Sequence, residues 1–139
     1  MKIVLDTNVL VSGLLNAKGN PSQVLGLALS GALQICYDEA IISEYAEVLA
    51  RPRFKFDPAR TAEVIAKIMK DGERIDSSSV AQLHLPDPDD EPFLAVALAS
   101  SSDFLVTGNM AHFPAEKRRG CSVIAPADFM VRWAARSTI

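Results

Sequence analysis

Acidic residues occur at three places in the chain where the neighbouring sequence is apolar. Asp6 directly follows the apolar residues 3–5, Glu44 borders an apolar helical stripe, and Asp90 precedes the apolar segment 93–99. Two carboxylates about 4 Å apart repel by about 4 kcal/mol at an effective dielectric of 20, and a divalent cation reverses that sign. Oxygen ligands suit Mg²⁺ or Mn²⁺, which activate water and clamp phosphodiesters. If the fold brings the three acids together, the chemistry they predict is metal-dependent phosphodiester hydrolysis.

The position of Asp6 follows from the strand expected over residues 2–5. A short apolar run of this kind is typical of a buried parallel strand. Asn8 is a suitable N-cap for the helix expected over residues 9–15. Asp6 then lies at the carboxyl end of a strand, the edge at which open α/β sheets bind ligands. Two interpretations remain open: Asp6 caps the helix, or it is a functional carboxylate supported by Thr7 and Asn8.

Glu44 and Asp90 belong to helices that we expect to be largely buried. At about 100° per residue, Glu44 lies at the margin of the apolar stripe of a helix that Asp38 caps. Asp90 lies where the helix that runs to about residue 101 begins. Both have simpler explanations, because a boundary Glu often extends to solvent and an Asp at a helix start often caps it. Asp87 and Asp89 also compete with Asp90 for the position of a ligand.

Asn109 is the fourth candidate, directly after the strand expected over residues 104–107. Thr107 ends this strand and Gly108 permits a tight turn. In a parallel sheet this turn lies at the same edge as Asp6. The amide carbonyl of Asn109 can bind Mg²⁺, although it brings no charge.

The elements that must position these residues alternate along the chain. Residues 73–80 form either a short strand or a loop. We expect strands at residues 2–5, 33–37, 104–107 and 121–125, and helices at residues 9–15, 21–30, 39–50, 58–72, 93–101 and 126–136. This alternation predicts an α/β fold: one domain over residues 1–139 with a central parallel sheet of four to five strands and helices on both faces.

Composition argues against a general attraction to nucleic acid. The 139 residues carry a formal net charge of −3, so contacts with RNA would need metal ions or a local basic segment. Arg51, Arg53 and Lys55 alternate with aromatic residues in one such segment, and residues 117–119 form another. The alternative in each case is a solvated loop.

Several sequence features bear on location and on other kinds of site. Cys36 and Cys121 lie in apolar runs and are expected to be buried, reduced thiols. His84 and His112 are isolated and fit no paired-ligand pattern. We expect neither a signal peptide nor a membrane-spanning segment, because no apolar run has the required length, and therefore expect a cytoplasmic protein.

Taken in order, four motifs resemble the PIN-domain ribonucleases. They are residues 5–8 (Leu-Asp-Thr-Asn), Glu44, residues 89–95 (Asp-Asp-Glu-Pro-Phe-Leu-Ala) and residues 105–109 (Leu-Val-Thr-Gly-Asn). They look most like the VapC-type toxins of toxin–antitoxin pairs. The resemblance implies that Asp6, Glu44 and Asp90 bind Mg²⁺ or Mn²⁺ and position water for RNA hydrolysis. Asn109 departs from the family pattern, which often carries a fourth Asp there.

The resemblance also implies partners. These are an RNA substrate and a small antitoxin protein, and a homodimer is typical of the family. A second functional hypothesis is a PIN-like module that binds RNA or a protein without cutting. The uncharged Asn109 supports this alternative, whereas the three acids argue against it.

Overall fold

Five short strands form the centre of the computed structural model, which describes residues 1–136: β1 (Lys2–Leu5), β2 (Gln34–Tyr37), β3 (Glu73–Arg74), β4 (Phe104–Val106) and β5 (Val123–Ile124). All pairings between them are parallel, and the strand order is β3-β2-β1-β4-β5. The register pairs Leu5 with Val106 at the carboxyl ends of the two central strands. The residues that follow β1 and β4 therefore meet at one edge of the sheet.

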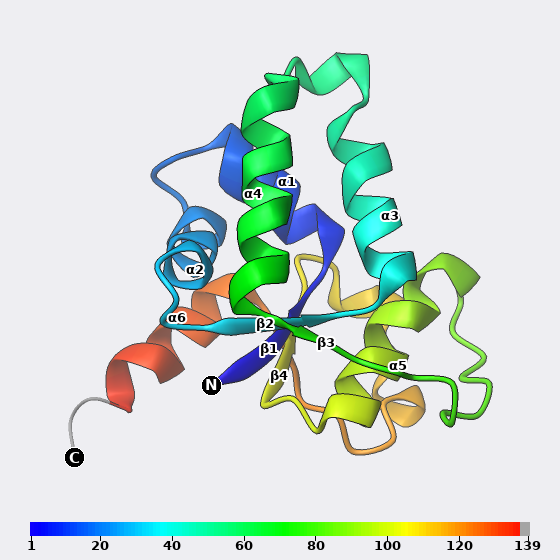
Figure 1. Cartoon of the computed structure of the whole chain (residues 1–139). Helices are drawn as coiled ribbons and strands as arrows, with labels where there is room; N and C mark the ends of the chain where they lie inside the picture. The colour runs from blue at the N-terminus through cyan, green and yellow to red at the C-terminus, as the bar shows by residue number, and fades with distance from the viewer. Residues whose placement is uncertain (137–139) are drawn as a thin grey trace.

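Six α-helices surround this sheet: α1 (Thr7–Leu15), α2 (Asn20–Leu29), α3 (Glu39–Leu49), α4 (Pro58–Asp71), α5 (Glu91–Ser100) and α6 (Pro126–Ala135). Figure 1 shows α1, α3 and α4 on one side of the sheet and α5 on the other, while α2 and α6 pack against each other. Four short 3₁₀ turns complete the described part of the chain: η1 (Pro52–Phe54), η2 (Pro88–Asp90), η3 (Met110–His112) and η4 (Ala115–Lys117). The predicted α/β architecture, with a parallel sheet covered on both faces, is confirmed.

The core explains why β1 occupies the centre. Ile3, Val4 and Leu5 are all fully buried, as a strand covered by helices on both faces requires. Burying side chains of this size contributes about 1.5–3 kcal/mol each. The apolar residues of α5, including Phe93 and Leu94, cover one face of this strand. Burial of these three side chains thus fixes the position of the segment that ends in Asp6.

The start of α1 differs from the prediction. The helix begins at Thr7, and its N-cap is Asp6 rather than Asn8. A single residue, Asp6, separates the strand from the helix, so the Asp6 carboxylate is the group that reaches the free N–H of Thr7, at 2.8 Å. Asn8 already lies in the first turn, where its side chain bonds to other residues. The predicted cap Asp38 is confirmed for α3, and Asp57 caps α4.

The last strand is shorter than predicted, and this changes the surroundings of Cys121. The backbone N–H of Cys121 donates to the Arg118 carbonyl oxygen at 2.9 Å, closing a turn that contains Gly120. The strand therefore begins only at Val123, and Cys121 stays half-buried. Cys36 is buried as expected, and both cysteines are free. Within residues 1–136, no helix combines the length and hydrophobicity that crossing a membrane requires.

Candidate active site

A cleft of about 370 Å³ opens at the carboxyl edge of β1, between α1, α3 and the segment that leads into α5. It gathers most of the polar residues that the sequence singles out. Its lining consists of Asp6, Thr7, Asn8, Val11, Ser12, Glu44, Val48, Arg51, Arg53, Phe54, Asp87, Asp89, Asp90 and His112. Residues from four separate parts of the chain thus share one cavity, as the predicted edge requires.

Asp6 lies at the base of the cleft and is only 4% exposed. Its Oδ1 accepts the N–H of Thr7, and its Oδ2 accepts the hydroxyl of Thr107 at 2.7 Å and the amide of Asn8 at 3.3 Å. Burial raises the pKa of Asp6, while the hydrogen bonds from Thr107 and Thr7 act in the opposite direction. The carboxylate is therefore both a helix cap and a buried acid fixed by three donors.

Thr107 and Asn8 join the ends of the two central strands. Thr107 is fully buried; it donates its single hydroxyl proton to Asp6 and accepts the N–H of Asn109 at 3.0 Å. The side-chain amide oxygen Oδ1 of Asn8 accepts the N–H of Gly108 at 3.0 Å. These contacts leave Asp6 little rotational freedom. Their effect is to aim one carboxylate at a set position on the sheet edge.

Glu44 projects over the same edge from α3. The next residue, Tyr45, is fully buried and donates its hydroxyl to the Leu5 carbonyl oxygen, which fixes the rotation of α3 against β1. Glu44 then accepts a hydrogen bond from the Thr7 hydroxyl. Burial raises the pKa of Glu44 despite this bond, and the charge of Asp6 adds to the rise. The predicted position at the margin of the apolar stripe is thus the position that reaches the cleft.

Asp90 is the most perturbed acid of the cleft. Only 9% of the residue is exposed, and burial followed by repulsion from Asp6 raises its pKa to about 6. Its Oδ2 is buried and lacks a hydrogen-bond partner among the described residues. That oxygen nevertheless lies 3.0 Å from Nδ1 of His112. A buried carboxylate oxygen without a hydrogen bond costs free energy, so it marks a place for a ligand.

The donor set of the cleft fits a hard divalent cation. It supplies carboxylate oxygens that repel one another and one oxygen that lacks a partner. Among residues 1–136, however, no three His, Cys, Asp or Glu side chains converge closely enough to form a complete metal cage. Mg²⁺ does not need such a cage, because it keeps several waters and takes one or two carboxylates plus substrate phosphates.

Two predicted site residues and one basic residue lie elsewhere. Thr107 is beneath the cleft, where it acts through Asp6. Asn109 is half-buried and bonds through its backbone to Thr107, but it is not among the lining residues. Lys55 is exposed at the end of η1, outside the lining.

The rest of the basic segment reaches the cleft. Arg51 pairs with Glu47 on the surface of α3. The Arg53 guanidinium lies 4.7 Å from the centroid of the Phe54 ring, which stacks on Phe56. Arg51, Arg53 and Phe54 thus bring positive charge and an aromatic surface to the same cleft as the acids.

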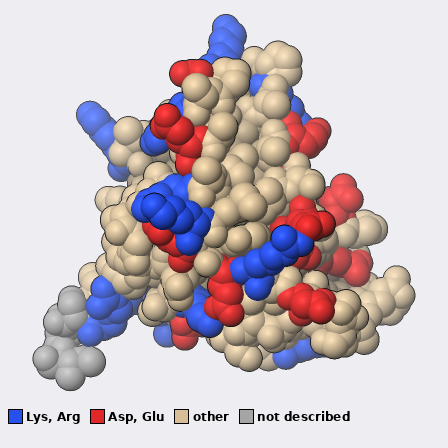
Figure 2. All heavy atoms as spheres, in the orientation of Figure 1, with Lys and Arg blue, Asp and Glu red and all other residues tan. Residues whose placement is uncertain are grey.

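The second basic segment, residues 117–119, has structural contacts instead. Arg118 donates to the Phe113 carbonyl oxygen at 2.7 Å. Arg119 donates to the carbonyl oxygens of Ala81 and Gln82, holding the loop before η2 against the turn before β5. These bonds favour the solvated-turn interpretation over a contact with RNA. On the face shown in Figure 2, Lys and Arg side chains lie in separate groups among acidic ones.

Sequence reasoning missed His112. A lone histidine has no spacing that marks it as a ligand, and its contact with Asp90 depends on how η3 folds after β4. One signal was present: His112 lies three residues after Asn109, in the segment in which a fourth acid was sought.

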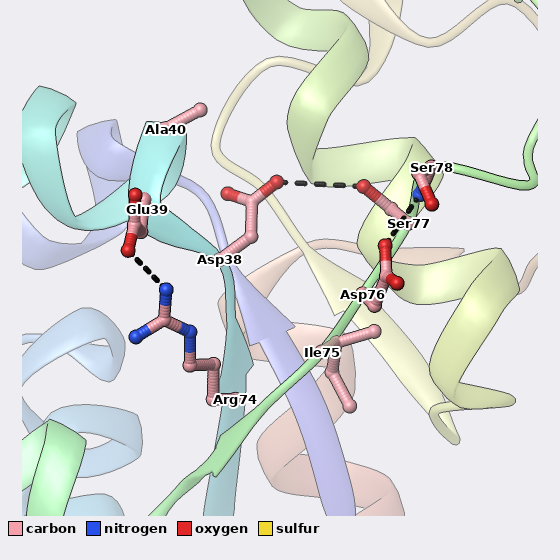
Figure 3. Close-up of a pocket in the computed structure, with 8 residues that line it drawn as sticks. All are labelled: Asp38, Glu39, Ala40, Arg74, Ile75, Asp76, Ser77 and Ser78. Carbon is pink, nitrogen blue, oxygen red and sulfur yellow. Dashed lines mark hydrogen bonds and ion pairs between the residues drawn. The ribbon is translucent and has the colours of Figure 1, made fainter.

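A larger hollow of about 550 Å³ lies beside the start of α3, and Figure 3 shows why it is the weaker candidate. Asp38 accepts hydrogen bonds from Ile41 N–H and from Ser77. Asp76 accepts from Ser78, and Glu39 pairs with Arg74. These acids accept hydrogen bonds or pair with a guanidinium within the chain, whereas Oδ2 of Asp90 accepts no hydrogen bond from the described residues and lies only at ion-pair distance from His112.

Comparisons with known proteins agree with this fold. The family described as the PIN domain matches residues 2–111. A chain of the crystal structure described as "VapBC2 from Rickettsia felis bound to a DNA fragment from their promoter" is similar in fold, with a TM-score of 0.56. The two chains are 14% identical, and the match covers 90% of this chain and 98% of the other. No curated protein gives a significant match.

Proposed function

The chain belongs to the PIN domain family, and from this premise we propose that it is a metal-dependent endoribonuclease. The observation that carries the proposal is the meeting of Asp6, Glu44 and Asp90 in one cleft at the sheet edge. The buried, unpartnered oxygen of Asp90 adds to it. These three acids would hold Mg²⁺ or Mn²⁺ and serve as the catalytic residues.

The chain's own residues would prepare the site for the ion. A bound divalent cation would supply water activation and charge neutralisation at a phosphodiester. Thr107 and Asn8 orient the Asp6 carboxylate, and Thr7 orients Glu44. Asn109 is a further candidate ligand through its amide oxygen. Because Asn109 is uncharged, the site lacks a fourth acid, and we expect it to hold one ion rather than two.

Arg51, Arg53 and Lys55 would contact RNA phosphates. The support is that Arg51 and Arg53 line the same cleft as the acids. Because the whole chain carries a formal net charge of −3, the contribution of this segment to RNA affinity is local. Phe54, half-buried beside Arg53, would offer a surface for base stacking.

We further propose that the protein is the toxin component of a toxin–antitoxin pair, is held by a small antitoxin protein and acts in the cytoplasm. The support is the likeness of its fold to a chain of the VapBC2 structure. A homodimer is the expected assembly, and gel filtration together with light scattering would test it.

A second function has one observation in its favour. Asn109 stands where the look-alike family often has an acid, and no three candidate ligands of residues 1–136 already form a cage. Both points suit a PIN module that binds RNA or a protein without cleaving it.

A cleavage assay separates the two functions. The purified chain is incubated with single-stranded RNA and Mg²⁺ or Mn²⁺, with and without EDTA. We expect metal-dependent cleavage that falls by at least about 100-fold in Asp6→Asn, which removes the charge but preserves the shape. Asp128→Asn, a change in an exposed acid of α6, is the matched control and should cleave like the parent. Cleavage by Asp6→Asn at the parent's rate would overturn the proposal.

A further inference from the structure

We propose that His112 is a metal ligand of this site through Nδ1, next to Oδ2 of Asp90. The inference rests on the proposed function and deepens it. It adds a nitrogen to a ligand set that the sequence suggests is made of oxygens alone, and it thereby changes the class of cation that the site selects.

The distance between the two atoms is the first support. His112 Nδ1 and Asp90 Oδ2 lie 3.0 Å apart, yet the oxygen has no hydrogen-bond partner among the described residues. Two ligands that each lie about 2.1 Å from one octahedral ion, at a right angle to each other, are also about 3.0 Å apart. The pair thus has the separation of neighbouring ligands without the geometry of a hydrogen bond.

Burial of the carboxylate is the second support. Asp90 is 9% exposed, and both it and His112 line the cleft. The Asp90 oxygen that accepts no hydrogen bond, Oδ2, is the one that lies next to the imidazole. An ion between the two atoms would satisfy this oxygen, which water reaches poorly. The imidazole is 43% exposed and has solvent on its open side, so further ligands and substrate can approach.

The local fold holds His112 at this position. Its backbone N–H donates to the Asn109 carbonyl oxygen, forming the η3 turn at the end of β4. The next residue, Phe113, is fully buried, and its carbonyl oxygen accepts the Arg118 guanidinium. The turn carries the Asn109 side chain outside the lining and brings His112 inside it. The ring therefore lines the cleft where Asn109, the fourth ligand candidate of the sequence, does not.

The chemical consequence concerns metal choice. Carboxylates alone suit Mg²⁺, whereas an imidazole favours later first-row transition metals. Because His112 carries no negative charge, it also adds a ligand without adding to the repulsion among Asp6, Glu44 and Asp90. The site should therefore discriminate against Mg²⁺ more strongly than a site made only of acids.

Mn²⁺ is the probe for the experiment, because its electron spin reports bound nitrogen directly. The chain contains only two histidines, so a ¹⁴N modulation in the spin-echo spectrum of the Mn²⁺ complex has few sources. We expect an imidazole signal in the parent and in His84→Gln, the matched control in an exposed loop. The signal should be absent from His112→Gln, whose Mn²⁺ Kd should rise by about 10- to 100-fold while its Mg²⁺ Kd changes far less.

The outcomes separate this inference from the proposed function. Mn²⁺ bound with no imidazole signal, or with equal affinity in parent and His112→Gln, would overturn the role of His112 but leave an acid-only nuclease standing. Failure of the parent to bind either ion would overturn both. Circular dichroism of His112→Gln checks its fold, and the spectrum of the unaltered parent decides the matter even if this variant unfolds.

Discussion

Replacing Asp90 by Asn should stabilise the metal-free protein. Burial and the charge of Asp6 raise the pKa of Asp90 from 3.8 to about 6, so ionising this carboxyl in the folded state costs free energy. A rise of about two pH units corresponds to about 3 kcal/mol. Because the cleft opens to solvent, which screens the charge, we expect Asp90→Asn to gain less than this, about 1–2 kcal/mol at about pH 7.

The direction in which stability changes with pH tests this explanation. Between pH values of about 4 and 6 the folded parent binds more protons at Asp90 than the unfolded chain does, so the parent loses stability as pH rises through this window. The stability of Asp90→Asn does not fall in this way. The difference in the free energy of unfolding between variant and parent should therefore disappear near the lower end of this pH window. Adding Mn²⁺ at about pH 7 should reverse the order, because only the parent offers the cation this carboxylate.

Urea unfolding in EDTA at several pH values measures the effect. Asp128→Asn is the control: this exposed acid lies in the first turn of α6, where its charge is favourable, so its replacement should give no gain. If Asp90→Asn is less stable than the parent by the same amount at every pH, the carboxylate is not strained by burial, and the electrostatic account of the cleft is wrong.

Two further predictions concern the rim of the cleft. Neutralising Arg51, Arg53 and Lys55 together should weaken RNA binding and reduce the slope of log affinity against log salt by up to about 2, and an unchanged slope would leave the segment a solvated loop. Asn109→Asp should lower metal-free stability and increase the rise in melting temperature on adding Mn²⁺, because the cation then neutralises a fourth charge. An equal rise, with equal metal-free stability, would place Asn109 outside the metal shell.

The features that could be predicted from sequence depend on short-range pattern. The run that ends in Asp6 and the alternation of strands and helices identify a parallel sheet. Since parallel strands share an edge, this places Asp6 near Thr107. The same pattern puts Glu44 at the margin of its helix, and the structure shows this margin facing the cleft.

The features that escaped prediction depend on exact geometry between distant segments. Whether Asp6 or Asn8 caps α1 depends on the exact residue at which the helix begins. A pattern of apolar residues does not define a helix start that precisely. The contact of His112 with Asp90 joins two 3₁₀ turns that approach only once the sheet is assembled. The bonds of Arg119 to Ala81 and Gln82 likewise have no counterpart in the spacing of charges.

The central position of β1 also has a consequence for the order in which the chain is made. β1 pairs with β4, which is synthesised about a hundred residues later, and the bond from Thr107 to Asp6 spans 101 positions. Long-range pairing of this kind forms late, because the intervening loop must first be closed. A nascent chain that has not yet produced η3 therefore carries Asp6 and Glu44 without the residues that orient and complete the cleft. The proposed cutting activity would arise only after β4 and η3 have been synthesised.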